Sequence, residues 1–369
     1  MSAWAKVKLG EICEFKYGKS LPQGARQAGE FSVYGSNGIV GSHSRSLTTG
    51  PTIVVGRKGS LGEVNYSELP CWPIDTTYYV DESATDVNLR WLYHCLGSLG
   101  LTRLNRAAAI PGLNREDAYR LLVLLPPIDE QRRIAQTLDH ADTLRAKRRE
   151  AIARLDELTQ AIFIDMFGDP SADAAKIEWT TIGAMLQSAQ YGTSEKSGSE
   201  GEFPVLRMGN ITYDGRIDLS DLKYMDLPAE KVARFTVRSG DILFNRTNSA
   251  ELVGKTAVFR GDRPVSYAGY LVRLRVKEGN SPEYISSFLN SKYGKAVLRG
   301  MCKSIVGMAN INAKEVQAIR IPDADQAVQQ QFAERCKRIE DARSQHLSAL
   351  DDLNSLFLSL QSRAFRGEL

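Results

Sequence analysis

The sequence has no long apolar run and little cysteine. None of its apolar runs approaches the ~20 residues that a helix needs to cross a bilayer, and its first residues lack the apolar centre of a secretion signal. The five cysteines are scattered and never stand as a Cys-X-X-Cys pair, which disfavours a disulfide framework and a zinc site. We therefore expect a cytoplasmic protein with reduced thiols and no contact with a membrane.

Motifs of catalysis are also missing. The sequence contains neither a cofactor loop nor the Asn/Asp-Pro-Pro-Tyr type of motif that an adenine methyltransferase requires. Gly254, Lys255 and Thr256 resemble the end of a phosphate-binding loop, but Ser249 stands where that motif needs glycine. The four histidines do not have metal-ligand spacings. We predict a chain without catalytic residues, metal ligands or a cofactor of its own.

Neither sign of charge is in large excess. The formal net charge is +3, and 25% of the residues are charged against 43% that are hydrophobic, which is typical of globular proteins. A length of 369 residues favours two or three domains. Any surface that binds nucleic acid must therefore come from local clusters of basic residues.

What the sequence does contain is an internal repeat, which indicates a repeated architecture. The matches keep their order along the chain. They pair Leu9-Gly10 with Ile182-Gly183, Tyr17-Gly18 with Tyr191-Gly192, the strand-ending Arg57 with Arg246, residues 110–114 with 308–312, and residues 131–135 with 329–333. The repeat predicts two similar units, with loop insertions in the second.

Each unit is expected to end in a long helix. We place the units at residues 1–128 and 169–322, and their helices at 129–168 and 323–369. Short β-rich runs predict strands at 52–55, 62–65, 76–80, 121–125, 203–208, 241–245, 256–259 and 270–276. Periodic apolar residues predict shorter helices at 88–96 and 282–298.

The two long helical segments carry apolar residues at alternating spacings of three and four, which is typical of coiled coils. The predicted seam consists of Ile134, Leu138, Ile152, Leu155, Ile162, Phe332, Ile339, Leu350, Leu353, Phe357 and Leu360. A single amphipathic helix packed on its own domain is the alternative for each segment. Two matched helices, one closing each unit, favour pairing with each other. If the pair is antiparallel, Arg145 and Arg148 would lie near Asp351 and Asp352.

Local clusters of basic and amide side chains occur in both units. They comprise Gln23, Arg26, Arg57, Lys58, Arg103 and Arg106 in the first unit, and Lys196, Arg207, Asn210, Arg246, Thr247, Asn248 and Lys303 in the second. Arg and Lys suit phosphates and guanine edges, and Asn and Gln suit adenine. Ordinary surface charge is the alternative for each residue. The strand-end turns at Arg57 and Arg246 are the stronger DNA-binding candidates, because they occupy matching positions.

These features together resemble the specificity subunits of type I restriction-modification systems, over essentially the whole chain. Residues 125–134, Leu-Pro-Pro-Ile-Asp-Glu-Gln-Arg-Arg-Ile, look like the start of that family's central conserved helix. Residues 154–170 look like the end of the same helix, and residues 360–369 look like the family's C-terminal ending. Residues 321–326 depart from the pattern, because they lack a double proline.

The resemblance implies an α+β fold with two mixed target recognition domains in tandem, a pseudo-twofold repeat and two conserved helices in an antiparallel coiled coil. Each domain would read one half of a split site in double-stranded DNA. The helices would set the spacing and dock two methyltransferase (modification) subunits, which carry S-adenosylmethionine. Restriction/translocase subunits would add ATP and Mg. The family offers no catalytic residue to carry over.

Two other functions are weighed against this interpretation. A single-chain restriction-methyltransferase would need catalytic motifs, which the sequence lacks. A coiled-coil scaffold without a DNA role would leave the matching basic turns unexplained.

Overall fold

The computed structural model describes the chain except residues 1–3, 105–111, 173–174, 176, 250–251 and 303–308. The chain divides into unit 1, which comprises Met1–Arg149 and Ser348–Leu369, and unit 2, which comprises Glu150–Leu347. Each unit holds a part of both long helices, α3 (Ile128–Phe167) and α9 (Gln326–Ala364). The division into two recognition units, 1–128 and 169–322, and two helical segments, 129–168 and 323–369, remains a prediction.

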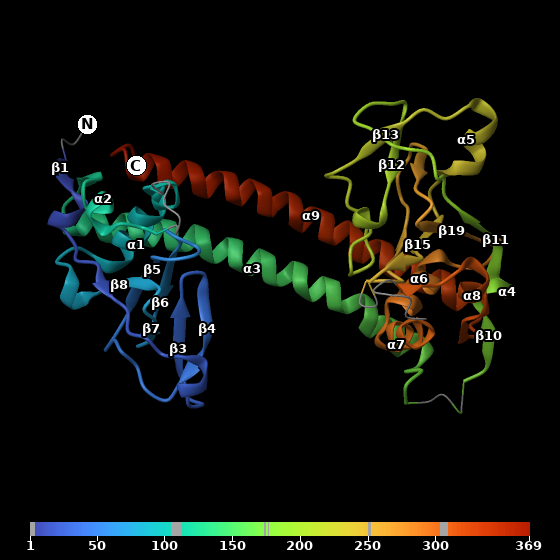
Figure 1. The fold of residues 1–369 in the computed structure, drawn as a ribbon, viewed down its shortest axis with the longest axis horizontal. Coiled ribbons are helices and arrows are strands. Elements are labelled where there is room, and N and C mark those ends of the chain that lie inside the picture. The colour runs from blue at the N-terminus through green and yellow to red at the C-terminus, as the bar shows by residue number, and fades with distance from the viewer. Residues whose placement is uncertain (1–3, 105–111, 173–174, 176, 250–251, 303–308) are drawn as a thin grey trace. The chain divides into compact units, whose positions relative to one another are not determined.

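Unit 1 contains two sheets and a separate strand pair (Figure 1). The first sheet is antiparallel, with the strand order β2 (Lys16–Tyr17), β8 (Thr77–Asp81), β5 (Thr52–Gly56) and β6 (Val64–Ser67). The second has the order β4 (Gly38–His43), β3 (Phe31–Gly35) and β7 (Trp72–Pro73), in which β3 and β7 are parallel. The separate pair is β1 (Ala5–Lys8) with β9 (Leu122–Leu125).

The helices of unit 1 besides α3 and α9 are short. They are α1 (Leu89–Ser98), α2 (Arg115–Tyr119) and the 3-10 turns η1 (Leu9–Glu11), η2 (Gln23–Ala25), η3 (Glu82–Ala84) and η4 (Leu101–Arg103). Asn88 caps α1, because its side chain accepts the N–H of Trp91. Trp91 is fully buried, in one core with Leu138 of α3 and Ala364 of α9. The long helices are therefore part of the hydrophobic core of unit 1.

Unit 2 repeats this arrangement with additions. One sheet has the order β11 (Leu186–Tyr191), β19 (Leu271–Val276), β15 (Ile242–Asn245) and β17 (Thr256–Val258). The other has the order β13 (Lys223–Met225), β12 (Phe203–Leu206), β18 (Val265–Tyr267) and β14 (Thr236–Val237). Two strand pairs complete it, β10 (Trp179–Thr181) with β21 (Arg320–Pro322) and β16 (Thr247–Asn248) with β20 (Ala309–Asn310).

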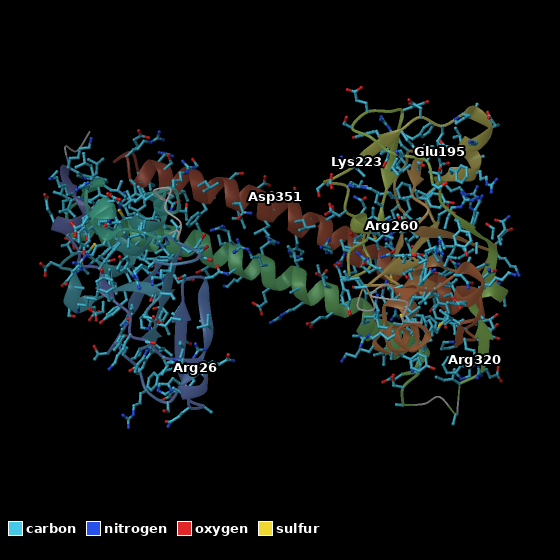
Figure 2. The ribbon with its side chains drawn as sticks, viewed as in Figure 1. Arg26, Glu195, Lys223, Arg260, Arg320 and Asp351 are labelled. Atoms are coloured by element: carbon cyan, nitrogen blue, oxygen red, sulfur yellow. The ribbon has the colours of Figure 1, made fainter. Side chains whose placement is uncertain are left out.

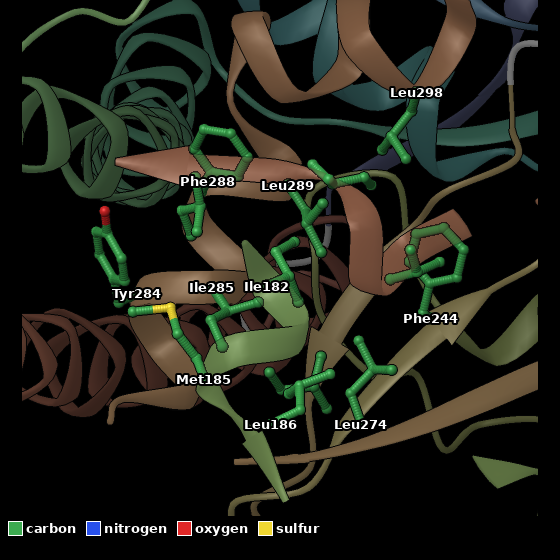
Figure 3. Packing of buried hydrophobic residues seen from close by; sticks show 14 of the residues in the cluster. Ile182, Met185, Leu186, Phe244, Leu274, Tyr284, Ile285, Phe288, Leu289 and Leu298 are labelled. Carbon is green, nitrogen blue, oxygen red and sulfur yellow. The ribbon is translucent and has the colours of Figure 1, made fainter. Parts of the chain in front are cut away.

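The shorter helices of unit 2 are α4 (Ile182–Met185), α5 (Ala229–Phe235), α6 (Pro282–Asn290), α7 (Lys292–Met301), α8 (Ala313–Ala318) and the turn η5 (Met208–Asn210). Helices α4, α6, α7 and α8 share one hydrophobic core with the first sheet, whereas α5 packs against the second sheet. Figure 3 shows Tyr284, Ile285 and Phe288 of α6 in the same core as Met185 of α4 and Leu274 of β19. Burial of these large apolar side chains is the main stabilising term for unit 2.

The prediction of one helix over residues 282–298 is wrong. The backbone of Ser291 is extended, with φ −65° and ψ 161°, and it separates α6 from α7. The hydroxyl of Ser291 accepts the N–H of Gly294 at 3.0 Å and caps the second helix. A serine inside an apolar pattern gave little sign of this break.

The predicted fold class is confirmed by the matching topology of the two units. The order β2-β8-β5-β6 in unit 1 corresponds to β11-β19-β15-β17 in unit 2. The parallel pair β3 and β7 corresponds to the parallel pair β12 and β18. The pairing of β1 with β9 likewise corresponds to that of β10 with β21.

Two buried glutamines show the repeat at the level of single hydrogen bonds. Gln131 of α3 accepts the N–H of Asn88 at 2.8 Å and donates to the carbonyl of Pro126 at 2.9 Å. Gln329 of α9 accepts the N–H of Ser281 at 3.0 Å and donates to the carbonyl of Ala324 at 2.8 Å. Each glutamine therefore ties the start of a long helix to the start of a shorter helix in its unit.

The antiparallel pairing of the long helices is confirmed inside unit 1. Arg133 donates to the carbonyl of Leu369 at 3.1 Å, and Arg145 donates to the side chain of Asn354 at 2.8 Å. Arg145 was expected near Asp351 and Asp352, but it also donates to Asp142, one turn earlier on α3, and its guanidinium carbon lies 4.4 Å from the ring centre of Phe357. Asp351 is exposed on α9 (Figure 2).

The same antiparallel direction is found inside unit 2. The rings of Phe163 and Phe332 lie 5.7 Å apart, and Arg343 donates to Asp156 at 2.8 Å. The residues of the predicted seam are buried at Ile134, Leu138, Ile152, Phe332 and Ile339, and half-buried at Leu155, Ile162, Leu350, Leu353, Phe357 and Leu360.

In the part of the chain that the structure describes, no helix combines the length and apolar character that a membrane span requires.

Candidate nucleic-acid interface

The basic turn of unit 1 directly follows β5. The backbone N–H groups of Arg57 and Lys58 both donate to the carbonyl of Thr76, at 2.9 and 3.1 Å. The guanidinium of Arg57 also donates to the carbonyl of Asp75 at 2.5 Å. Lys58 is exposed. The turn therefore has a fixed backbone and presents two cationic side chains at the end of the sheet.

Aromatic rings lie beside this turn. The guanidinium carbon of Arg57 is 5.4 Å from the ring centre of Tyr17 and 5.8 Å from that of Tyr78, which is within the range of cation–π attraction. Burial raises the pKa of Tyr78 to about 12, so its hydroxyl stays protonated and donates to the carbonyl of Leu113 at 3.2 Å. The Nε atom of Arg57 is buried and has no hydrogen-bond partner among the described residues.

These residues surround an open cavity of about 480 Å³. Its lining consists of Tyr17, Arg57, Lys58, Tyr78, Gly112, Leu113, Asn114, Arg115 and Glu116. Three of the four charged residues in this set are cationic. The cavity therefore suits an anionic group more than a cationic or apolar one.

Unit 2 has the corresponding turn after β15. The N–H of Arg246 donates to the carbonyl of Tyr270 at 3.1 Å, and its guanidinium carbon is 4.8 Å from the ring centre of Tyr191. The carbonyl of Arg246 accepts the N–H of Ile311 at 2.9 Å, as the carbonyl of Arg57 accepts the N–H of Leu113. The predicted correspondence of the two arginines therefore extends to their backbone partners and to the tyrosine that each contacts.

Thr247 and Asn248 follow Arg246 in the short strand β16. Thr247 donates from its hydroxyl to the side-chain oxygen of Asn310 at 3.3 Å. The side-chain oxygen of Asn248 accepts the N–H of Ser249 at 2.9 Å. Both residues are half-buried, so part of each side chain remains open to solvent.

The tyrosine beside each arginine is positioned by the glycine that follows it. A Cβ atom on Gly18 would lie 2.1 Å from the carbonyl oxygen of Ile74, and one on Gly192 would lie 2.3 Å from that of Tyr267. A side chain cannot be placed at either position without moving the backbone, which explains the repeated Tyr-Gly pair. Tyr17 and Tyr191 were matched in the sequence repeat, but their place in the candidate site was missed.

Arg115 was also missed by the sequence reasoning. It is the first residue of α2, whose N-cap is Asn114. Its guanidinium carbon lies 5.4 Å from the ring centre of Tyr17. The asparagine at the matched positions 114 and 312 was the available signal, because each caps a helix beside the basic turn.

The other predicted residues of unit 1 lie outside the lining of this cavity. Arg26 donates to the carbonyls of Val40 and Leu21 at 2.6 and 3.3 Å, so it supports the hairpin of β3 and β4 (Figure 2). Gln23 and Arg103 are exposed, in η2 and η4. Arg106 lies outside the described residues.

Two predicted residues of unit 2 are held in a structural network. Asn210 is 3% exposed, and its amide donates to the carbonyls of Asp218 and Asp221, each at 2.9 Å. Arg207 pairs with the carboxylate of Asp221 at 2.9 Å. These contacts stabilise the loop after β12 and leave the Asn210 amide little capacity for another partner. Lys196 is exposed, and Lys303 lies outside the described residues.

The described residues contain no group of three or more His, Cys, Asp or Glu side chains placed to hold a metal ion. The five cysteines are free, and burial raises the pKa of the Cys13 thiol to about 12. A buried, protonated thiol is a poor nucleophile.

Comparison with known families agrees with this chemistry. Residues 1–154 match the family model of the type I restriction modification DNA specificity domain. This match covers the first segment of unit 1, Met1–Arg149, but not its second segment, Ser348–Leu369, and it includes Tyr17, Arg57 and Arg115.

Similar proteins extend the resemblance beyond residue 154. The chain is 24% identical over 294 residues to the type I restriction enzyme EcoKI specificity subunit of Escherichia coli (strain K12), with 73% of this chain and 62% of that protein covered. It is 23% identical to the StySPI specificity subunit of Salmonella potsdam, with the same coverage. It is 24% identical over 366 residues to the EcoBI specificity subunit of Escherichia coli, covering 86% of this chain and 73% of that protein. The matched region thus spans less than two thirds of the EcoKI and StySPI subunits.

Solved structures with the same fold cover the whole chain. The S subunit of a type I restriction-modification system from M. genitalium superimposes with a TM-score of 0.64 at 16% identity, over 98% of this chain and 96% of that one. A chain from a structure on complex assembly and conformational transition of the type I system gives a TM-score of 0.57 at 17% identity, covering 100% of this chain and 99% of that chain. The resemblance predicted from the sequence is confirmed: residues 1–154 match the family model of the type I DNA specificity domain, and the chain is similar over most of its length to specificity subunits of type I restriction-modification systems.

Proposed function

We propose that this chain is the DNA-specificity subunit of a type I restriction-modification complex. Unit 1 and unit 2 each bind one half of a bipartite site in double-stranded DNA. The observation that carries the proposal is the recurrence of the arginine–tyrosine arrangement, Arg57 with Tyr17 and Arg246 with Tyr191. It recurs at the same strand end, with the same backbone partners, in a chain that contains a DNA specificity domain.

The chemistry of these turns fits contact with the DNA backbone. Arginine and lysine neutralise phosphates and release condensed counterions, which makes affinity fall steeply with salt. Such contacts fix the position of a protein on the duplex, whereas the sequence is read by groups that reach base edges. Arg57, Lys58 and Arg246 are therefore proposed to position each unit on its half-site. Thr247 and Asn248 have the side chains to reach a base edge.

We propose that α3 and α9 set the spacing of the two half-sites and dock the modification subunits. They contain 40 and 39 residues, and a 40-residue helix has a length of about 60 Å at 1.5 Å per residue. One turn of B-DNA is about 34 Å. The helices keep large apolar side chains exposed, namely Leu144, Leu356 and Leu358 in unit 1 and Leu158, Ile164 and Leu347 in unit 2. Exposed apolar side chains of this kind favour contact with a protein partner.

The chain is proposed to be non-catalytic alone and to act in the cytoplasm. Adenine methylation would be performed by two modification subunits, which bring S-adenosylmethionine. Restriction/translocase subunits would add ATP, Mg and cleavage. The basis in this chain is the lack of catalytic motifs noted in the sequence.

Mapping of methylated adenines tests this proposal. The gene is expressed together with its modification subunits in a host that lacks adenine methylation, and genomic DNA is sequenced with a method that detects methylated bases. We expect a single split motif that disappears when this chain is omitted. Methylation that is unchanged by its omission would overturn the proposal. Purified chain alone should transfer no methyl group.

A further inference from the structure

The ring of Tyr17 contacts two guanidinium groups in unit 1. The guanidinium carbons of Arg57 and Arg115 are each 5.4 Å from the ring centre. The first arginine comes from the turn after β5, and the second from the start of α2. Stacking on a shared ring restricts both side chains before any ligand binds, which lowers the entropy lost on binding.

The cavity beside them has an excess of positive charge. Arg57, Lys58 and Arg115 line it together with one carboxylate, that of Glu116. Glu116 lies 3.5 Å from the Nε atom of Arg115, and its side chain is 62% exposed. An ion pair this open to water contributes little, so Glu116 leaves most of the donor capacity of Arg115 free. The buried Nε atom of Arg57 adds a donor with no partner among the described residues.

We propose that Arg57, Lys58 and Arg115 form a phosphate clamp for the DNA backbone, and that Arg115 is a DNA-contacting residue. This inference rests on the proposed function and deepens it. Guanidinium groups match phosphate oxygens with two parallel donors, and an ammonium group binds them as a point charge. The clamp holds adjacent backbone phosphates of the half-site that unit 1 binds, and Tyr17 positions the two guanidinium groups.

The clamp is not repeated in unit 2. Ala313 takes the place of Arg115 at the start of α8, and its N–H donates to the hydroxyl of Tyr191 at 3.0 Å. Thr247 takes the place of Lys58, and the exposed Lys314 takes the place of Glu116. Among the described residues, Arg246 alone places a guanidinium on Tyr191. The two half-sites are therefore bound by different phosphate contacts.

The salt dependence of DNA binding tests the clamp. The chain is assembled with its modification subunits, and the dissociation constant of a duplex carrying the mapped motif is measured across a series of salt concentrations. Loss of one phosphate contact lowers the slope of log K against log salt by about 0.9. We expect Arg115→Ala to lower the slope by that amount and to weaken binding about 5- to 10-fold near 0.1 M salt. The methylated motif should stay the same.

Two further variants separate this role from a structural one. Arg120→Ala is the matched control, because Arg120 caps the other end of α2, is 70% exposed and does not line the cavity. It should leave the slope unchanged. Arg115→Lys keeps the charge and should restore the slope of the natural protein. If Arg115→Ala binds with the natural slope, the clamp is wrong while the proposed function stands. If the natural complex shows no motif-selective binding, the proposed function itself fails.

Discussion

At the scale of single residues, buried polar groups with specific partners define where each unit joins its long helix. Gln131 is 4% exposed and Gln329 is 1% exposed, and each satisfies one backbone donor and one backbone acceptor. A buried donor or acceptor that loses its partner costs about 1–3 kcal/mol. These glutamines therefore contribute more to stability than exposed glutamines on the same helices.

Replacement of Gln131 tests this. Gln131→Leu leaves the N–H of Asn88 and the carbonyl of Pro126 without their partner. We expect the free energy of unfolding to fall by about 2–4 kcal/mol, measured by urea denaturation. Gln136→Leu, at an exposed position of α3, should change it by less than about 0.5 kcal/mol. Equal effects of the two variants would contradict the role of Gln131.

A buried lysine gives unit 2 a pH dependence. Lys295 is 8% exposed, and it lies 5.1 Å from the ring of Tyr213 and 3.5 Å from the carbonyl of Gly254. Burial, with repulsion from Lys255 and Arg299, lowers its pKa from 10.5 to about 8. Between pH 8 and 10.5 the unfolded chain binds the proton that the folded chain has lost. Burial of Lys295 therefore lowers the free energy of unfolding below pH 8, and this destabilising effect becomes smaller as pH rises from 8 to 10.5.

Lys295→Met removes this titration. We expect the variant to be more stable than the natural protein at pH 7, by up to about 3 kcal/mol, and this advantage should shrink as pH rises from 8 to 10. The measurement is the difference in unfolding free energy between the two proteins at each pH, so that other titrating groups cancel. Lys292→Met, at an exposed position of α7, should show a difference that is independent of pH. A constant difference for Lys295→Met would contradict the account.

At the scale of elements, the sequence predicted periodic and repeated features well. The strand predicted at 241–245 is observed as Ile242–Asn245, and the first long helix, predicted at 129–168, is observed as Ile128–Phe167 with Gly168 directly after it. Both features follow from nearby residues in the sequence: the strand from its run of apolar residues, and the helix end from the glycine that follows it. The break at Ser291 comes from a serine that caps the next helix within its own turn, which the apolar pattern does not show. The roles of Arg26 and Asn210 come from hydrogen bonds that their side chains make to backbone carbonyls across loops. Arg115 was missed because Tyr17 is far from it in the sequence.

Helix pairing in unit 2 depends on a cluster of charges around Asp156 of α3. Its carboxylate accepts from Arg343 of α9 at 2.8 Å and from Arg216, in the loop after β12, at 2.5 Å. Arg216 also pairs with Asp214. The two arginine side chains are 17% and 21% exposed. Loss of the shared carboxylate leaves these partly buried charges with weaker compensation, from Glu340 for both and from Asp214 for Arg216.

Asp156→Asn should destabilise this cluster. We expect the free energy of unfolding to fall by about 1–3 kcal/mol, and amide hydrogens of residues 212–216 to exchange faster. Glu157→Gln, at the neighbouring exposed position, serves as the control and should leave both quantities unchanged. Unaltered exchange in Asp156→Asn would show that the loop is held by other contacts.

At the scale of the whole molecule, repetition is the feature that links sequence, fold and proposed function. Two units share one topology, one glutamine contact and one arginine–tyrosine turn. A single-chain enzyme would need a catalytic site in addition, and a scaffold would not need matching basic turns. Two similar units with different side chains at those turns suit a site made of two unlike halves.

Exchange of one unit's recognition segment tests the central claim most directly. Residues 179–322 are replaced by the corresponding segment of another specificity subunit, and methylated adenines are mapped in cells that also express the modification subunits. We expect one half of the methylated motif to change, while the other half and the spacing between them are kept. A motif that changes in both halves, or in neither, would contradict two independent DNA-reading units.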